Sequence, residues 1–253
     1  MAPTAGQRYA LPGNDFKRLA IGRRVLYLHN DLVDQADAII QVAMHPAAAT
    51  VGDSTSGAGN RNSGFPLKLG NGNDLFIRYA RRGGLMRFLN RSVYVGVNPR
   101  PVHELAVTAE ARRRGLPVAE PMGAMVQWLA PALYRGAFIT RMLHGMTLWQ
   151  FVQTDDDPAV RAHVIELARC AISLAHQKGL FHADLNLHNL LVSTAGESFA
   201  AVLIDLDKAR LYASSVTSAM RKKNLARLRR SISKLDPRGR YFNEAMVTTL
   251  TAS

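Results

Sequence analysis

The feature that most constrains this chain is a polar loop near residue 185, set between apolar segments. The loop contains His182, Asp184 and Asn189 at the spacing His-x-Asp-x4-Asn. A helical pattern precedes it and a hairpin pattern follows it, in which the apolar run Ala201 to Ile204 ends directly on Asp205. Chance would explain a lone His-x-Asp, but not this spacing in this context. The pattern therefore predicts a functional loop.

The loop has the spacing of the catalytic loop of protein kinases, and Asp205 stands where their metal-binding strand ends. Phosphoryl transfer requires a protein to orient the acceptor hydroxyl, to hold Mg²⁺ on the phosphates of ATP and to spread the developing charge. We predict that Asp184 accepts the proton of the attacking hydroxyl. Asn189 and Asp205 offer the oxygen ligands that Mg²⁺ takes. His182 completes the predicted catalytic loop, where we expect it to brace the backbone.

A second interpretation of the same loop is a metal site formed by His182, Asp184 and His188. Such a site would need further ligands at a recognisable spacing. The sequence offers none, and the kinase-like interpretation is favoured.

The N-terminal half contains a stretch rich in small residues, 52–72, which includes Gly57 and Gly59. It suits either a disordered insertion or a glycine-rich phosphate loop between two strands. Its position, ahead of a strand pattern, predicts that Gly57 and Gly59 bind nucleotide.

The strand after this stretch carries Arg78, where a kinase has its phosphate-binding Lys. Arginine stays charged and can hold two phosphate oxygens, although its planar fork is not interchangeable with an ammonium group. A plain surface arginine is the alternative. We expect Glu104, on the following helix, to pair with Arg78 and orient it, with Glu110 as the second candidate.

Segment patterns along the chain predict an α+β fold. Short strands are expected at 23–28, 74–79, 116–118, 124–128 and 136–142, with one helix at 101–114. Beyond residue 145 we expect helices at 158–178 and 218–235 on either side of the hairpin. The prediction is a bilobal protein-kinase-like fold, with an N-terminal extension at 1–20, a strand-rich N-lobe at 21–142 and a short helical C-lobe at 143–253.

The chain is strongly basic: 32 Lys and Arg face 19 Asp and Glu, for a formal net charge of +13. Its expected partners are therefore anionic, such as a nucleotide, a nucleic acid or a phosphorylated membrane surface. No aromatic-interleaved basic patch or known nucleic-acid motif is present, which argues against nucleic acid. No stretch approaches the roughly 18 uninterrupted apolar residues that a spanning helix needs. Membrane contact is expected to be peripheral.

The last predicted helix concentrates this charge around an apolar line of Leu225, Leu228, Ile232 and Leu235. A helix lying on an anionic membrane surface has this pattern. An ordinary core helix with a solvated basic face has it too. Only 46 residues follow Asp207, fewer than protein kinases use to dock a peptide, so we expect a small or membrane-borne acceptor.

Four separated stretches carry a family resemblance: 77–85, with Arg-Arg-Gly-Gly-Leu; 104–118; 182–189, with His-Ala-Asp-Leu-Asn; and 224–231. With these the chain resembles the 3-deoxy-D-manno-octulosonic acid (Kdo) kinases of the lipopolysaccharide kinase family. In that family Arg also occurs where protein kinases have Lys, which fits Arg78. The resemblance is weaker around Gly57 and Gly59, where the small-residue stretch is longer than expected.

The resemblance implies transfer of the ATP γ-phosphate to a hydroxyl of the Kdo sugar of Kdo-lipid A. It implies a peripheral protein on the cytoplasmic face of a bacterial inner membrane, and it places Asp184, Asn189 and Asp205 at the family's catalytic-loop and metal-strand positions. Two alternatives stay open: a kinase for another small hydroxylated acceptor, as in aminoglycoside and choline kinases, and an inactive kinase fold that serves as a scaffold.

Overall fold

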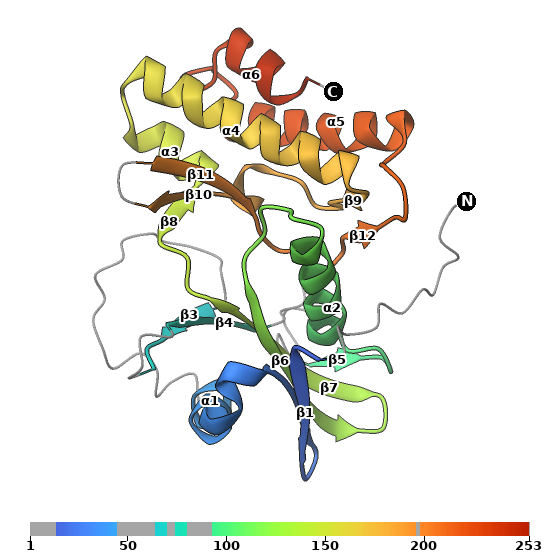
Figure 1. The fold of residues 1–253 in the computed structure, drawn as a ribbon. Coiled ribbons are helices and arrows are strands. Elements are labelled where there is room, and N and C mark those ends of the chain that lie inside the picture. The colour runs from blue at the N-terminus through green and yellow to red at the C-terminus, as the bar shows by residue number, and fades with distance from the viewer. Residues whose placement is uncertain (1–13, 45–63, 70–73, 80–92, 196–197, 253) are drawn as a thin grey trace. The chain divides into compact units, whose positions relative to one another are not determined.

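The computed structural model describes residues 14–44, 64–69, 74–79, 93–195 and 198–252 (Figure 1). Among these residues the chain divides into two compact units. The strand unit comprises residues 14–109 and 120–142, and the helical unit comprises residues 110–119 and 143–252.

The strand unit is built on one antiparallel sheet. Its strands follow the order β1-β2-β6-β7-β4-β3, and β5 also pairs with β7. Their bounds are β1 Phe16–Ile21, β2 Arg24–His29, β3 Gly64–Leu67, β4 Leu75–Tyr79, β5 Tyr94–Val95, β6 Pro121–Ala130 and β7 Leu133–Arg141. The sheet begins at Phe16, within the segment expected to be an extension.

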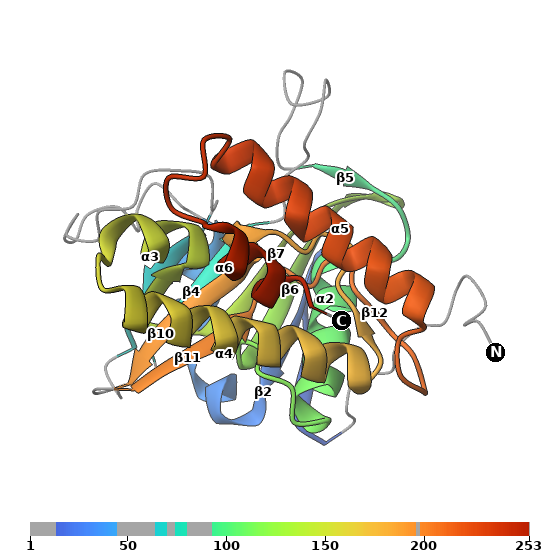
Figure 2. The ribbon, with the colours of Figure 1, turned by 90° about the horizontal axis from the view of Figure 1, so that it is seen from above.

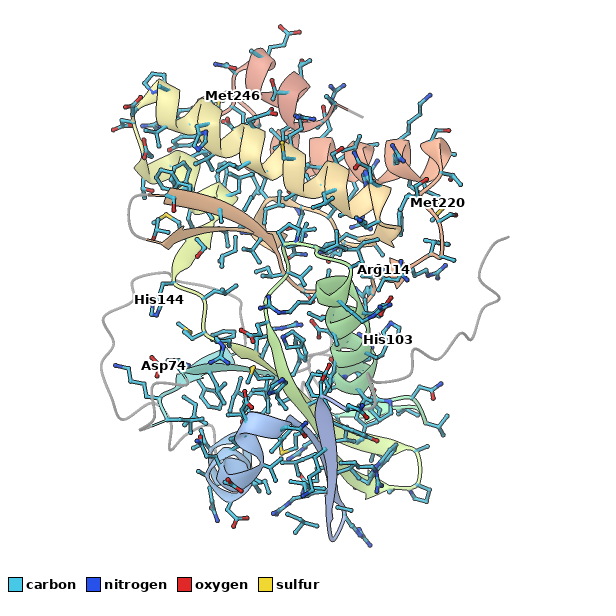
Figure 3. The ribbon with its side chains drawn as sticks, in the orientation of Figure 1. Asp74, His103, Arg114, His144, Met220 and Met246 are labelled. Carbon is cyan, nitrogen blue, oxygen red and sulfur yellow. The ribbon has the colours of Figure 1, made fainter. Side chains whose placement is uncertain are left out.

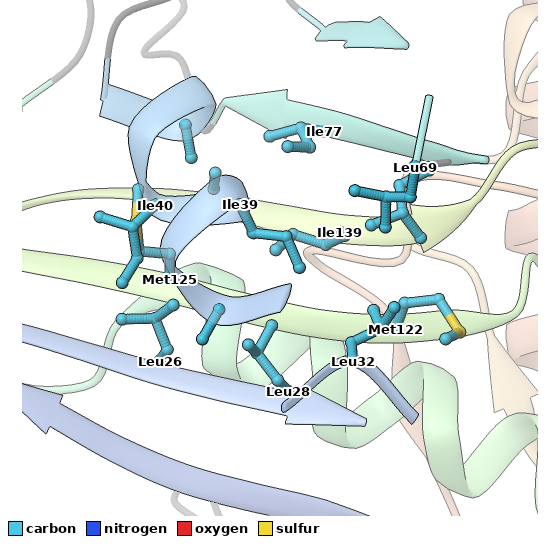
Figure 4. Close-up of a cluster of buried hydrophobic side chains, with 14 residues drawn as sticks. Leu26, Leu28, Leu32, Ile39, Ile40, Leu69, Ile77, Met122, Met125 and Ile139 are labelled. Carbon is cyan, nitrogen blue, oxygen red and sulfur yellow. The ribbon is translucent and has the colours of Figure 1, made fainter. Parts of the chain in front are cut away.

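A helical segment covers one face of this sheet. It consists of the 3-10 helix η1 (Asn30–Gln35) and helix α1 (Ala36–Met44), neither of which the sequence patterns had indicated. Ile39 and Ile40 of α1 are buried against Leu26, Leu28, Ile77, Met122 and Ile139 from the sheet (Figure 4). Ala36 and Ala43, at helical spacing from these isoleucines, complete the apolar stripe of α1.

Helix α2 (Arg100–Arg113) confirms the predicted helix to within one residue at each end. Pro101 lies in its first turn, and Gly115 follows its end with a φ of 76°, a left-handed conformation that favours glycine. Leu105 packs against Ala124 and Phe138 of the sheet. The residues of α2 up to 109 belong to the strand unit.

Among the described residues, the helical unit contains the α-helices α3 to α6, one 3-10 helix and two small sheets. Their bounds are β8 Gly145–Thr147, α3 Leu148–Thr154, α4 Pro158–Gln177, β9 Leu180–Phe181, the 3-10 helix η3 Leu187–Asn189, β10 Leu190–Ala195, β11 Ser198–Leu203, β12 Arg210–Leu211, α5 Ser218–Leu235 and α6 Glu244–Leu250. Strand β10 pairs antiparallel with β11, which confirms the predicted hairpin, and with β8. Strand β9 pairs with β12.

Helix α4 begins as the sequence predicted. The Asp157 side chain accepts hydrogen bonds from the backbone N–H groups of Ala159 and Val160, at 2.8 and 3.4 Å, with Pro158 in the first turn. The acidic triplet therefore caps a helix. The opposite end of α4 leads through residues 180–181 to the predicted catalytic loop.

Helix α5 has the predicted bounds, and its apolar line packs inside the protein. Leu225, Leu228 and Ile232 are buried, while the basic side chains between them are exposed. Helix α6, which the sequence did not predict, follows α5 and lies between α4 and α5 as seen in Figure 2. Asp236 shapes the turn before α6, because its carboxylate accepts three backbone N–H groups, those of residues 240–242, each at 2.8 Å. No helix in the described part of the chain is both long and apolar enough to span a membrane.

Candidate active site

The predicted catalytic loop follows a closely packed segment of the helical unit. Gly179 has a φ of 85°, and a Cβ atom there would lie 2.4 Å from the carbonyl oxygen of Tyr212. Arg114, labelled in Figure 3, donates hydrogen bonds to the carbonyls of Lys178 and Tyr212, at 2.9 and 2.6 Å. These contacts fix the residues just before β9, from which the loop departs.

His182 braces the loop from inside. Its side chain is buried, its Nδ1 accepts the backbone N–H of Asp184 at 3.2 Å, and its Nε2 lies 2.9 Å from the carbonyl oxygen of Ile204. Since a carbonyl only accepts, Nε2 carries the proton. Burial lowers the pKa of His182 below its ordinary value, which keeps the ring neutral. The ring therefore joins the backbone of Asp184 to the residue before Asp205.

Two asparagine side chains of the same loop bind the backbone carbonyl of Asp184. It accepts hydrogen bonds from Asn186 Nδ2 at 2.8 Å and from Asn189 Nδ2 at 2.9 Å. Asn189 is buried, and its own carbonyl accepts the backbone N–H of Ile204 at 3.1 Å. Both backbone polar groups of Asp184 are thus engaged, so the direction of its carboxylate is set by the loop.

Asn189 and Asp205 suit Mg²⁺ in the chemistry of their donor atoms. The Asn189 amide is oriented by the bond from its Nδ2 to the Asp184 carbonyl, which leaves its oxygen as the ligand atom. Asp205 has a φ of 63°, a left-handed conformation that is uncommon outside glycine and recurs at functional sites. An amide oxygen and a carboxylate are hard ligands, and Mg²⁺ in kinases takes few protein ligands beside phosphates and water. These two residues fit the ion.

The alternative metal site finds no support. In the part of the chain that the structure describes, no group of three or more His, Cys, Asp or Glu side chains is placed to hold a metal ion. His182, one of its proposed ligands, uses both ring nitrogens in hydrogen bonds to the backbone.

Asn224 and Arg227 of α5 contact the loop close to Asp184, and the sequence interpretation missed both contacts. Asn224 is 1% exposed and donates from Nδ2 to the carbonyl of His182 at 2.6 Å, while its Oδ1 lies 3.1 Å from Nε2 of His176. Arg227 Nη1 lies 2.7 Å from Oδ1 of Asp184. A polar residue beside the apolar line of α5 was the available signal for Asn224. Arg227 lies in the stretch 224–231 that carries the family resemblance, but nothing within that stretch distinguished it from its basic neighbours.

In the strand unit, Arg78 of β4 forms an ion pair with Glu104 of α2. Glu104 is buried, and Arg78 is partly exposed, with 22% of its side chain accessible. The predicted partner is therefore confirmed. Glu110, the second candidate, instead bonds to Arg113 and Arg114, at 2.7 and 2.8 Å. The predicted nucleotide ligands Gly57 and Gly59 lie outside the described residues.

Comparison with known proteins identifies the family. A family model described as the lipopolysaccharide kinase (Kdo/WaaP) family matches residues 54–250. A 3-deoxy-D-manno-octulosonic acid kinase of Xylella fastidiosa (strain M12) is 34% identical over 180 residues, covering 70% of this chain and 68% of that protein. A protein of the same name from Actinobacillus succinogenes is 32% identical over 164 residues, covering 62% of this chain and 65% of its own length.

A solved structure supports the same conclusion at the level of the fold. The structure "WaaP in complex with acyl carrier protein" aligns with a TM-score of 0.53 and 15% sequence identity, covering 89% of this chain and 88% of that one. The predicted protein-kinase-like fold is thereby confirmed. Because the family model matches most of the chain and the predicted catalytic loop is held in place by hydrogen bonds, the chain belongs to the lipopolysaccharide kinase (Kdo/WaaP) family and is a phosphotransferase.

Proposed function

We propose that this kinase transfers the γ-phosphate of ATP to a hydroxyl of the Kdo sugar of Kdo-lipid A, in the biosynthesis of the lipopolysaccharide core. The proposal rests on the names of its relatives and on the family match. The observation that carries it is the catalytic loop, in which the N–H and carbonyl groups of Asp184 are both fixed by hydrogen bonds. Such a loop presents one carboxylate in a defined direction.

Asp184 is the group that would meet the acceptor. Its side chain is 37% exposed, so a hydroxyl can approach it from solvent. The carboxylate accepts a hydrogen bond from the hydroxyl, orients its oxygen for attack and takes its proton as the bond to phosphorus forms. His182 acts on Asp184 only through the backbone and is a positioning residue.

Asn189 and Asp205 would hold Mg²⁺, with the Asn189 oxygen and the Asp205 carboxylate as ligands. When bound with ATP, the ion neutralises charge on the phosphate oxygens. The backbone of Ile204, the residue before Asp205, connects the two ligands, because its N–H donates to the backbone carbonyl of Asn189 and its C=O accepts from Nε2 of His182. The same braces that fix Asp184 therefore fix both metal ligands.

Arg78 would bind phosphate oxygens of ATP in place of the lysine of protein kinases. Its pairing with the buried Glu104 holds the guanidinium in one orientation, which suits a planar group that must meet oxygens at defined positions. Glu104 is thus a positioning residue for Arg78.

We place the protein at the cytoplasmic face of the inner membrane, bound peripherally. In the apolar line of α5, Leu225, Leu228 and Ile232 are buried and Leu235 is partly buried, so attachment through this helix would be electrostatic. Lys223, Arg230 and Lys234 recur at helical spacing on its exposed surface. A row of basic side chains attracts anionic lipid.

An acceptor panel tests the proposal. Purified protein is incubated with Mg²⁺ and γ-labelled ATP, and with Kdo-lipid A, lipid A without Kdo, an aminoglycoside or choline in parallel. We expect label in Kdo-lipid A alone, with the added phosphate located on the Kdo residue by mass spectrometry. Label in a small alcohol and none in Kdo-lipid A would overturn the acceptor assignment. Absence of ATP turnover with every acceptor would favour the scaffold alternative.

A further inference from the structure

The ion pair between Arg227 and Asp184 places a cation directly beside the proposed proton acceptor. The pair is joined by one guanidinium nitrogen, Nη1, at 2.7 Å from Oδ1. Both side chains are accessible, 47% for Arg227 and 37% for Asp184. The remaining donors of the guanidinium are available to a further acceptor, since arginine carries five N–H groups in a fixed fork.

The position of Arg227 is set by its helix. Asn224, one turn before it, donates to the carbonyl of His182 at 2.6 Å, and Ser231, one turn after it, accepts the backbone N–H of Leu187 at 3.4 Å. Leu228, the next residue in the chain, is fully buried. Helix α5 therefore contacts the predicted catalytic loop one turn before and one turn after Arg227. These two contacts hold the Arg227 guanidinium next to Asp184.

The ion pair between Arg227 and Asp184 is not needed to stabilise the folded protein. An ion pair between two accessible side chains contributes little, because both ends are well solvated. The loop around Asp184 is already fixed by His182 and Asn189 without it. A solvated arginine beside a reactive carboxylate is better suited to bind a second anion than to hold the loop.

The proposed acceptor brings such an anion. The relatives are named for a sugar acid, and a carboxylic acid of this kind is ionised at neutral pH. When a hydroxyl of that sugar binds Asp184, the sugar carboxylate enters the neighbourhood of a second carboxylate, and like charges repel. A cation that contacts Asp184 is placed to offset this repulsion, and arginine recognises carboxylates in a planar, two-bond geometry.

We propose that Arg227 binds the carboxylate of the acceptor sugar and thereby selects an acidic sugar over a neutral one. The inference rests on the proposed function. Arg227 keeps its contact with Asp184 and uses its other donors for the substrate, so that one side chain sets the distance between the reacting hydroxyl and the acid group.

The test compares two acceptors, Kdo-lipid A and the same compound with its sugar carboxylate converted to the methyl ester, and three proteins. The proteins are wild type, Arg227→Gln, and the control Arg229→Ala, which removes a positive charge from the opposite side of α5, where Arg229 contacts Thr251. For wild type and for the control we expect kcat/KM to fall about 10- to 100-fold on esterification, the range for a hydrogen bond to a charged group. For Arg227→Gln we expect kcat/KM with the acid to lie below the wild-type value by a similar factor. Esterification of the acceptor should then lower kcat/KM of this variant only slightly. The KM for ATP should stay within about twofold in all three.

Several outcomes separate this inference from the proposed function. If wild type uses acid and ester equally well, or if Arg227→Gln discriminates as wild type does, the assignment of Arg227 is overturned while the function stands. If wild type labels neither acceptor but still binds ATP, the proposed function itself fails. The comparison of acid with ester in wild type needs no variant, so poor folding of Arg227→Gln cannot remove the test. Arg227→Lys, which keeps the charge, should recover part of the discrimination.

Discussion

Replacing Asn224 with leucine should loosen the catalytic loop from within. Asn224 is buried and joins two other buried groups, the carbonyl of His182 and Nε2 of His176. Leucine has a similar size but can serve neither group. The substitution therefore removes a polar bridge between α4, α5 and the loop without opening a large cavity.

The expected magnitude follows from what each partner loses. The His182 carbonyl keeps a hydrogen bond from the backbone N–H of Leu185 at 3.1 Å. Removal of its second hydrogen bond, from Asn224, should therefore cost about 1 kcal/mol. Nε2 of His176 is left buried and unpaired, at about 1–3 kcal/mol. The free energy of unfolding of the helical unit should fall by about 2–4 kcal/mol, which corresponds to a melting temperature lower by roughly 4–16 °C.

Urea denaturation followed by circular dichroism measures this loss, with Lys222→Ala, an exposed change on the same helix, as the control. A double-mutant cycle with His176→Leu sharpens the test. The double variant should be more stable than the sum of the two single losses predicts, by about 1–2 kcal/mol, because it no longer leaves a polar partner unpaired. A loss below about 0.5 kcal/mol for Asn224→Leu, or strict additivity in the cycle, would refute this reasoning.

Three further predictions concern nucleotide binding, pH and the membrane. Arg78→Ala should raise the KM for ATP, and it should also destabilise the strand unit because it removes the ion pair to the buried Glu104. Calorimetry should show that Arg78→Ala with Glu104→Gln recovers part of the stability but none of the ATP affinity, because the second change removes the buried charge. Burial lowers the pKa of both His176 and His182, so these groups bind protons at a higher pH in the unfolded chain than in the folded one. The free energy of unfolding should therefore fall below about pH 6.5, by up to about 1.4 kcal/mol per pH unit for each histidine, and His176→Gln should remove one of these two contributions in urea titrations at several pH values. Binding of the protein to anionic vesicles, measured by co-sedimentation, should weaken as the salt concentration rises and should be weaker still for the double variant Arg230→Glu with Lys234→Glu. Co-sedimentation that does not change with salt would contradict electrostatic attachment.

Local patterns predicted much of the fold. Spacing, caps and turn residues indicated α2, α4, α5 and the β10–β11 hairpin, because each of these depends on residues close in sequence. The pairing of Arg78 with Glu104 was also predicted, since the order of strand and helix implied it. Helices α1 and α6 were missed, because both are short and their apolar residues gain order mainly from packing against other elements.

In the candidate site, too, only the residues that lie close together in the sequence could be predicted. Asp184, Asn189 and Asp205 stand at fixed intervals around one loop, so the sequence could indicate them. Asn224 lies 42 residues beyond its partner His182 and Arg227 lies 43 residues beyond its partner Asp184, and only the packing of α5 brings them to the loop. The sequence of the basic helix α5 suits either a helix that lies on a membrane surface or a core helix with a solvated basic face. In the structure Leu225, Leu228 and Ile232 of this helix are buried, and its Arg227 contacts Asp184.

The most direct test of the account is the rate of phosphate transfer to Kdo-lipid A by wild type and by Asp184→Asn, with ATP binding measured separately for each. Asparagine keeps the size of the side chain and both backbone contacts, but it cannot take the hydroxyl proton. We predict a fall in kcat of at least about 100-fold and an ATP dissociation constant within about twofold of wild type. Equal turnover by the two proteins would contradict the assignment of Asp184, and with it the catalytic role given to this loop.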